Sequence, residues 1–192
     1  GRKWRPGETI VSSIGQGAMQ ATPLQLAVMT ARLVNGGFAV KPWVSGYLGD
    51  ALMSKKEWPS MGLDQRHLAI VKKGMDATVN TKKGTAYGSR IEDPLMAMGG
   101  KTGTAQVKKI TKAEREAGIK NEDLIWRHRH HALFVGYAPM NNPKYVTSVV
   151  VEHGVGGSKT AAPIARDLLL EAQKRDPAST TIFAGRQEGK PV

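Results

Sequence analysis

Residues 132–152 decide the fold: the apolar run ALFVGYA (132–138), the connection PMNNPK (139–144) and the run YVTSVVVE (145–152). The first run is apolar throughout, as expected of a central strand, and the last is rich in β-branched residues. Proline and asparagine dominate the connection, which has hairpin length and the composition of a turn. Together the three segments predict an antiparallel β-hairpin.

Working outward, the pattern predicts one more strand before this hairpin and one helix after it. Residues 100–107, GKTGTAQV, read as a short strand that is polar on both faces. A closing helix is predicted from about Pro163 to about Lys174, lying back on the sheet. The side chains expected to face the core are Ile164, Ala165, Leu168, Leu169 and Ala172.

A helix is predicted near the start of the chain, over about residues 23–35. Thr22 suits the N-cap, Pro23 the first helical position, and Gln25 completes a capping box. Gly36 and the glycine after it would end the helix. Apolar residues surround it on several sides, so it is expected to be largely buried; those at helical spacing are Leu24, Val28, Ala31 and Val34.

A second helix is predicted over about residues 65–80, with Asp64 as its N-cap. Its expected core face consists of Leu68, Val71, Met75 and Val79. Between the two helices, residues 38–48 read as extended, and Pro42 confines that segment to a sheet edge or a bend.

The order of elements indicates an α+β fold, with an antiparallel sheet packed between helices. Residues 1–175 are expected to form the folded portion, and residues 176–192 a loosely ordered tail without periodicity. Residues 108–129 form a long insertion between two strands, with a possible helical turn at 112–117. Both a functional lid and a mobile surface insertion are compatible with this length.

Composition narrows the classes of function. Hydrophobic residues make up 40% and charged residues 23% of the 192 residues, which is typical of globular proteins. No apolar run approaches the roughly 20 residues of a membrane-spanning helix. The chain has no start methionine, and we expect a fragment of a longer protein. It also has no cysteine, which excludes disulfides and thiolate chemistry in this segment.

The net charge of +12 raises the question of nucleic-acid binding. The basic residues are spread over the whole chain, and no basic segment is interleaved with aromatic residues that could stack on bases. A solvated basic surface is therefore favoured, and no nucleic-acid partner is expected.

Three other motifs fail on inspection. The Gly100-Lys101-Thr102 triplet lacks the upstream glycine of a phosphate-binding loop, because Leu95 stands there. Gly15-Gln16-Gly17 lacks the third glycine of a dinucleotide fingerprint. The histidines at 128, 130 and 131 lack the further ligands that a metal site needs. A basic segment at the start of a strand is therefore favoured over a metal site. No metal or cofactor is expected.

The informative motif is Lys101-Thr102-Gly103-Thr104. Lys-Thr-Gly is one of the three motifs of serine penicillin-recognising enzymes. An edge strand with a glycine lets an acyl substrate lie against its backbone, and unpaired N–H groups can donate to that substrate. The lysine supplies positive charge, and the two threonine hydroxyls can bind a carboxylate. Strict alternation, however, puts Lys101 and Gly103 on one face and both threonines on the other.

Together with other segments, this motif makes the chain resemble class B penicillin-binding proteins, most closely the penicillin-binding protein 2 group of the cell-elongation machinery. The resemblance spans about residues 7–172, and its elements occur in family order. The matching segments are Gly15-Gln16-Gly17 with residues 21–27, Asn80 with Gly84-Thr85-Ala86, residues 100–105, residues 131–139 and residues 161–164.

The resemblance implies a transpeptidase fold, of which residues 1–175 would be the C-terminal portion. The family acylates a serine with the D-Ala-D-Ala end of a peptidoglycan stem peptide, and an amine from a second peptide then forms the cross-link. On this chain Lys101 and Thr104 would be catalytic, Thr104 through its backbone N–H in the oxyanion hole. Thr102 and Thr104 would bind the substrate carboxylate, and Gly103 would keep the groove open.

The resemblance also implies partners and a location. The partners would be stem peptides, β-lactam antibiotics, the N-terminal remainder of the same protein, and the glycosyltransferase and scaffold proteins of cell elongation. The location would be the periplasmic face of the bacterial inner membrane, with the anchor outside this chain. No cofactor is implied.

One departure from the family is large. No serine here is followed by lysine three residues on or by asparagine two residues on. The nucleophile, its base and the middle motif are therefore expected upstream, and the chain alone should be inactive. Alternatives that share the Lys-Thr-Gly strand are a D,D-carboxypeptidase, a serine β-lactamase or a β-lactam sensor. A basic non-catalytic domain that binds anionic wall polymers is a further alternative.

Overall fold

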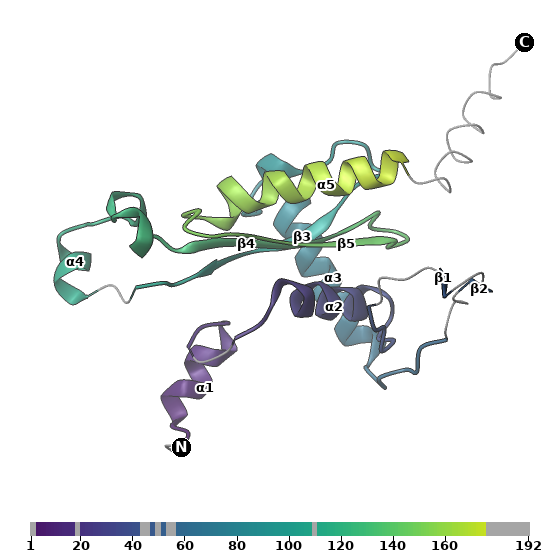
Figure 1. The fold of residues 1–192 in the computed structure, drawn as a ribbon, viewed down its shortest axis with the longest axis horizontal. Helices are drawn as coiled ribbons and strands as arrows, with labels where there is room; N and C mark the ends of the chain where they lie inside the picture. Colours follow the sequence, from purple (N-terminus) through teal and green to yellow (C-terminus); the bar gives the residue numbers. More distant parts are fainter. Residues whose placement is uncertain are drawn as a thin grey trace, which may run out of the picture.

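The computed structural model describes residues 3–17, 20–42, 47–48, 51–52, 57–108 and 111–175. Its central feature is a three-stranded antiparallel sheet of order β3-β4-β5 (Figure 1). The strands are β3 (Gly99–Ala105), β4 (His131–Ala138) and β5 (Tyr145–Val151). The predicted hairpin and the central place of the apolar run are both confirmed.

Two glycines let β3 lie against the aromatic side chains of β4. A Cβ atom on Gly100 would lie 2.3 Å from Cζ of Phe134 and 2.6 Å from the carbonyl oxygen of Val135. One on Gly99 would lie 2.7 Å from the ring of Tyr137. Phe134 and Tyr137 are fully buried, so neither ring can move aside without repacking the core.

Helices cover both faces of the sheet, as the α+β prediction requires. In Figure 1, α5 (Ala162–Arg175) lies above the sheet, and α2 (Pro23–Val34) lies below it. Helix α3 (Gln65–Asn80) packs against β3 and joins the two layers. Its Met75 packs in a core cluster with Val34 and Tyr137. One turn later, Val79 belongs to the larger cluster around Phe134 and α5.

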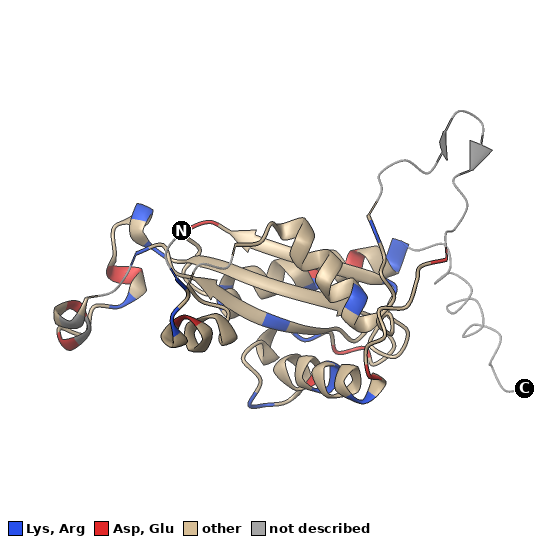
Figure 2. Ribbon diagram, turned by 90° about the horizontal axis from the view of Figure 1, so that it is seen from below, with Lys and Arg blue, Asp and Glu red and all other residues tan. Residues whose placement is uncertain are grey.

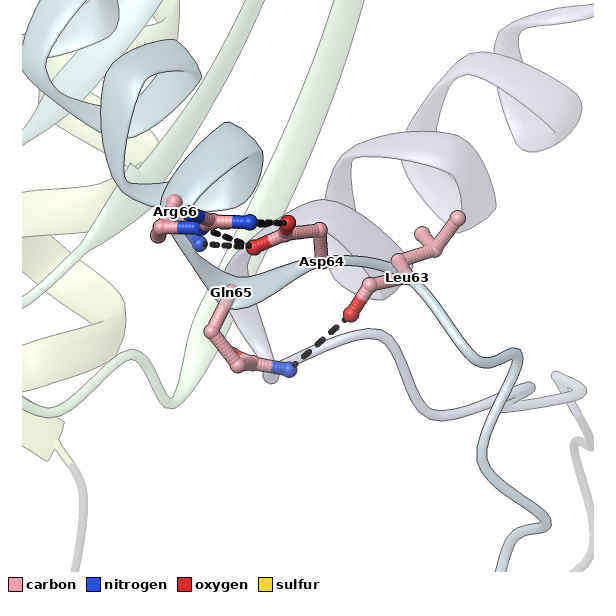
Figure 3. A network of polar contacts seen from close by, with 4 residues as sticks. All are labelled: Leu63, Asp64, Gln65 and Arg66. Carbon is pink, nitrogen blue, oxygen red and sulfur yellow. Dashed lines mark hydrogen bonds and ion pairs between the residues drawn. The ribbon is translucent and has the colours of Figure 1, made fainter.

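The two predicted N-caps, Thr22 and Asp64, are both confirmed. The hydroxyl of Thr22 accepts a hydrogen bond from the Gln25 N–H, and the Gln25 side chain accepts one from the Thr22 N–H. At α3 the Asp64 carboxylate accepts from the Arg66 N–H at 2.8 Å and pairs with the Arg66 guanidinium (Figure 3). The guanidinium, followed by the backbone hydrogen bond, lowers the pKa of Asp64.

The predicted core faces are only partly confirmed. Helix α2 is not largely buried, because only Thr30 and Val34 are buried, while Leu24 is 59% exposed. One side of α2 packs on β4 and β5, and its other side lines an open groove that includes Met61. The predictions for Val71 in α3 and for Ile164 and Leu168 in α5 are wrong in the same way, since all three are exposed.

The remaining elements are short. They are α1 (Pro6–Ser13), the paired strands β1 (Tyr47–Leu48) and β2 (Ala51–Leu52), η1 (Tyr87–Ser89), α4 (Lys112–Glu116), η2 (Asn121–Asp123), η3 (Trp126–His128) and η4 (Gly157–Ala161). Helix α4 confirms the helical turn predicted in the insertion.

Two sequence-based expectations fall partly or wholly outside the described residues. Part of the extended segment 38–48 and the whole tail 176–192 lie there. Within the segment, Phe38 forms an isolated antiparallel bridge with Ser60. None of the described helices is long and apolar enough to cross a membrane.

Candidate active site

Strand β3 carries the four residues predicted for the site in one continuous stretch. Lys101 and Thr104 are exposed, and Thr102 and Gly103 are half-buried. Since β3 is an edge strand of the described sheet, only one of its sides pairs with β4. The other side is the open edge of β3 in the described part of the chain, and the site is built along it.

The register shows which peptide groups face this open edge. Gly103 is paired with Leu133, and a Cβ built on Gly157 would crowd the Leu133 carbonyl and both the N and the O of Gly103 together. The peptide groups of Gly103 therefore point toward β4. Because neighbouring residues of an antiparallel strand point their N–H and C=O groups to opposite sides, those of Thr102 and Thr104 point to the open edge.

Two hydrogen bonds support this assignment. The carbonyl of Thr102 accepts from Nζ of Lys101 at 2.8 Å, and the carbonyl of Thr104 accepts from Nε2 of Gln16 at 3.2 Å. The first bond also explains how Lys101 can act beside Thr102 and Thr104, although strand alternation places its side chain on the opposite face. Lys101 leaves the strand on the opposite face from the threonines, but its flexible stem brings the ammonium group back to the open edge beside Thr102.

The hydroxyl of Thr102 faces the loop that follows α3. Its Oγ1 lies 2.9 Å from Oγ1 of Thr85, and either hydroxyl can be the donor. The loop is held against the end of α3, because the Ala86 N–H donates to the Thr78 carbonyl at 3.0 Å. Gly84 is required there, since a Cβ on it would lie 2.3 Å from that same carbonyl. Thr85 is thus a fixed partner for Thr102.

The glycine at the start of η4 lets this segment pack directly on the strand pair at the site. A Cβ atom on Gly157 would lie 2.3 Å from the carbonyl oxygen of Leu133 and 2.6 Å from that of Gly103. A Cβ atom on Gly103 would meet one atom within 4 Å among the described residues, the Cβ of Leu133 at 3.3 Å. The backbone at Gly103 is therefore held from one side by η4 and along its length by β4.

The histidines near the start of β4 bind backbone groups. His130 is buried, and its Nδ1 accepts from the Val107 N–H at 3.4 Å. Burial, followed by the charge of His131, lowers the pKa of His130. Nδ1 of His131 accepts from the His153 N–H at 2.9 Å. No group of three potential metal ligands occurs among the described residues.

These histidines also close the base of the 108–129 insertion. Val107 comes before the insertion and His130 follows it, so their hydrogen bond joins its two ends. Asn121, inside the insertion, accepts from the His130 N–H and donates to the Val155 carbonyl. In Figure 1 the insertion extends beyond the ends of β3 and β4. Both alternatives for the insertion, a functional lid and a mobile surface insertion, stay predictions.

The structure thus brings together residues that the sequence separates widely. Gln16 and Thr85 were recognised only as parts of family segments, and neither was predicted to touch the Lys-Thr-Gly strand. Gln16 lies 88 positions before Thr104, and Thr85 lies 17 before Thr102. The signal in the sequence was that Gln16, Thr85 and the Lys-Thr-Gly strand all lie in segments that resemble the same family. Such a resemblance does not say which residues are in contact.

Comparison with known proteins matches residues 1–170 to the family described as "Penicillin binding protein transpeptidase domain". The chain is 37% identical to peptidoglycan D,D-transpeptidase MrdA of Haemophilus influenzae, covering 88% of this chain and 26% of that protein.

Solved structures agree. Penicillin-binding protein 2 (PBP2) of Pseudomonas aeruginosa, in complex with WCK 5153, superposes with a TM-score of 0.70 at 36% identity, covering 92% of this chain and 34% of that one. PBP2 of Helicobacter pylori, in complex with MreC, gives a TM-score of 0.67 at 31% identity, covering 88% and 28%. The chain spans about a quarter of the length of the curated relatives it matches.

Proposed function

Because the chain belongs to the penicillin-binding protein transpeptidase family, we propose that the complete protein is a peptidoglycan D,D-transpeptidase. It cross-links stem peptides through a serine acyl-enzyme and is a target of β-lactam antibiotics. The carrying observation is the open edge of β3, where the peptide groups of Thr102 and Thr104 and the Lys101 ammonium gather. The D,D-transpeptidase relatives favour this function over a sensor or a hydrolase.

Each residue of the strand has a proposed role. The Thr104 N–H donates to the oxyanion that forms when the serine oxygen attacks the acyl carbonyl. The Lys101 ammonium, which already reaches the open edge, orients the substrate and supports proton transfer at the serine. The hydroxyls of Thr102 and Thr104 bind the terminal carboxylate, and Gly103 leaves room for the substrate backbone.

The serine, its lysine base and the middle motif are assigned to the N-terminal remainder of the same protein. Stem peptides and β-lactams are the proposed small-molecule partners. By analogy with the PBP2–MreC complex of H. pylori, and with a peptidoglycan synthase complex that coordinates polymerization and crosslinking, the protein would work with scaffold proteins and a glycosyltransferase of cell elongation. We place it at the periplasmic face of the bacterial inner membrane, with the anchor outside this chain.

The test is labelling of the full-length protein with a fluorescent penicillin. The wild type is compared with Lys101→Ala and Thr104→Pro, and the isolated chain serves as a control. Proline at 104 removes the N–H that faces the open edge and no hydrogen bond to β4, so the sheet is expected to tolerate it. We expect a labelled wild type, sharp loss in both variants and no label on the isolated chain.

The contrary outcomes are distinct. An unlabelled wild-type protein would overturn the proposed function. Full labelling of both variants would remove Lys101 and Thr104 from the site while leaving the function in place. A labelled isolated chain would show that a nucleophile lies within these 192 residues.

A further inference from the structure

We propose that Gln16 is a positioning residue for acylation: its side-chain amide holds the Thr104 carbonyl at the open edge of β3 and thereby fixes the backbone of Thr104, whose N–H is aimed at the oxyanion. The inference rests on the proposed function and extends it to a residue outside the Lys-Thr-Gly strand. Its basis is the hydrogen bond of 3.2 Å from Nε2 of Gln16 to the carbonyl of Thr104.

Gln16 is held in place by the way α1 ends. The Gly15 N–H donates to the Ser12 carbonyl, and the Gln16 N–H donates to the Val11 carbonyl. With Gly15 in the left-handed region at φ +74°, these two bonds form a Schellman motif, with Gln16 at its last position. Gly17 is also left-handed, at φ +88°. Gln16 is therefore a half-buried side chain between two glycines that the backbone requires.

The chemistry of the contact fixes the orientation of the amide. A backbone carbonyl can only accept, so the NH₂ end of Gln16 must face Thr104. The pairing of Gly103 and Ala105 with β4 holds the strand from one side. On the open edge, among the described residues, the side chain of Gln16 donates the hydrogen bond that holds the Thr104 carbonyl. Without it, the carbonyl of Thr104 would be free to tilt, and the backbone dihedral angles that set the direction of the Thr104 N–H would be less restricted.

A competing function for Gln16 can be separated by experiment. A substrate that adds to the open edge as an extended strand would also seek the Thr104 carbonyl. A carbonyl has two lone pairs and can accept from both groups. If Gln16 only filled the edge in the absence of substrate, its removal would make binding tighter. If it positions the peptide, its removal slows the chemical step and leaves binding nearly unchanged.

The experiment measures penicillin acylation of the full-length protein, resolving the dissociation constant of the initial complex from the first-order acylation rate. The variants are Gln16→Met, which keeps the length but cannot donate, and Gln16→Glu. Gln20→Ala is the control in the same segment. We expect Gln16→Met to slow acylation about three- to tenfold, as for loss of one neutral hydrogen bond, with an unchanged dissociation constant.

The Gln16→Glu variant adds a pH readout. Its carboxylate repels the Thr104 carbonyl at pH 7.5, but the protonated acid can donate, and glutamate has a pKa of about 4.3. The rate of Gln16→Glu relative to wild type should therefore rise from pH 7.5 to pH 5, whereas the relative rate of Gln16→Met stays flat.

Three results would overturn the inference. They are an acylation rate of Gln16→Met equal to that of the wild type, a lower dissociation constant of the initial complex for that variant, and a rate of Gln16→Glu relative to wild type that does not change between pH 7.5 and pH 5. Each is read against a wild type that acylates. A wild type that fails to acylate contradicts the proposed function itself, so the two failures are distinguishable.

Discussion

Thr102 of β3 illustrates how a neighbouring residue can determine which hydrogen bonds a side chain has left for a substrate. The Thr102 hydroxyl has one hydrogen to donate. When Thr85 donates to it, that hydrogen is left for a substrate carboxylate, and the chain of two hydroxyls polarises the donor. The proposed carboxylate contact of Thr102 thus depends on a hydroxyl in a different loop.

Replacement of Thr85 tests this dependence. We expect Thr85→Val in the full-length protein to slow penicillin labelling about fivefold, as for about 1 kcal/mol of hydrogen bonding, while Thr85→Ser stays near wild type. The matched control is Thr81→Val at the C-cap of α3, because the Thr81 hydroxyl bonds only to the Ala77 carbonyl of that helix among the contacts described. Equal rates for Thr85→Val and wild type would show that Thr85 has no influence on the site.

At the scale of elements, the packing of β3 on β4 depends on glycine. We expect Gly100→Ala to lower the stability of the full-length protein by about 2 kcal/mol, because the added methyl group meets the Phe134 ring and the Val135 carbonyl. Thermal unfolding measures the change. Gly88→Ala, with open space around its Cβ, is the control. An equal melting temperature for the two variants would contradict this account of the packing.

Helix α4 is held by one carboxylate. Glu114 accepts from the N–H and the hydroxyl of Thr111 and pairs with Lys108, and the pKa of Glu114 is lowered to about 2, chiefly by Lys108. A carboxyl whose pKa is lowered by folding stabilises the folded state at pH values above its ordinary pKa of 4.5. This contribution is lost as the pH falls through the pKa of the folded state.

Hydrogen exchange in α4 should follow this titration. We expect the protection factors of the α4 amides to hold at neutral pH, to weaken below about pH 4.5 and to vanish toward about pH 2. Glu114→Ala should remove the protection at neutral pH, and Glu122→Ala should not. Protection in Glu114→Ala equal to wild type would show that the carboxylate does not hold the helix.

The sequence predicted elements better than it predicted burial or contacts. The hairpin, its antiparallel pairing and the caps at Thr22 and Asp64 follow from local chemistry, which a short stretch contains in full. The capping box of Thr111 and Glu114 is local chemistry of the same kind, although only a helical turn is predicted there from the sequence. Burial is not local: Leu24 has the right spacing for a core face, but no described element covers it. The contact of Gln16 with Thr104 depends on tertiary packing, and periodicity carries no information on it.

At the scale of the whole molecule, the charged and apolar surfaces have different significance. Figure 2 shows lysine and arginine scattered over several elements rather than gathered on one face. Exposed apolar side chains, in contrast, recur along α1 and α2, including Ile10, Val11, Leu24 and Met29. Such surfaces are typical of chains that pack against further protein.

Assembly from two pieces tests this picture. We expect the isolated chain, mixed with an N-terminal piece that carries the remainder of the protein, to restore penicillin labelling, with the label on the N-terminal piece because the serine is proposed to lie there. Denaturing electrophoresis separates the two. The Lys101→Ala version of this chain should restore little label. Label on the present chain would contradict the division of the site between the pieces.

The closed base of the 108–129 insertion has a consequence for engineering. The Val107–His130 hydrogen bond and the Ala105–His131 pairing join the two ends of the insertion. The insertion is therefore a loop whose ends are fixed by the pairing of β3 with β4. Closing a flexible loop costs only about 0.6 kcal/mol more for each doubling of its length. A peptide tag or small reporter domain grafted between α4 and η2 should therefore leave the sheet intact, which makes this loop a practical handle for following the protein in living cells.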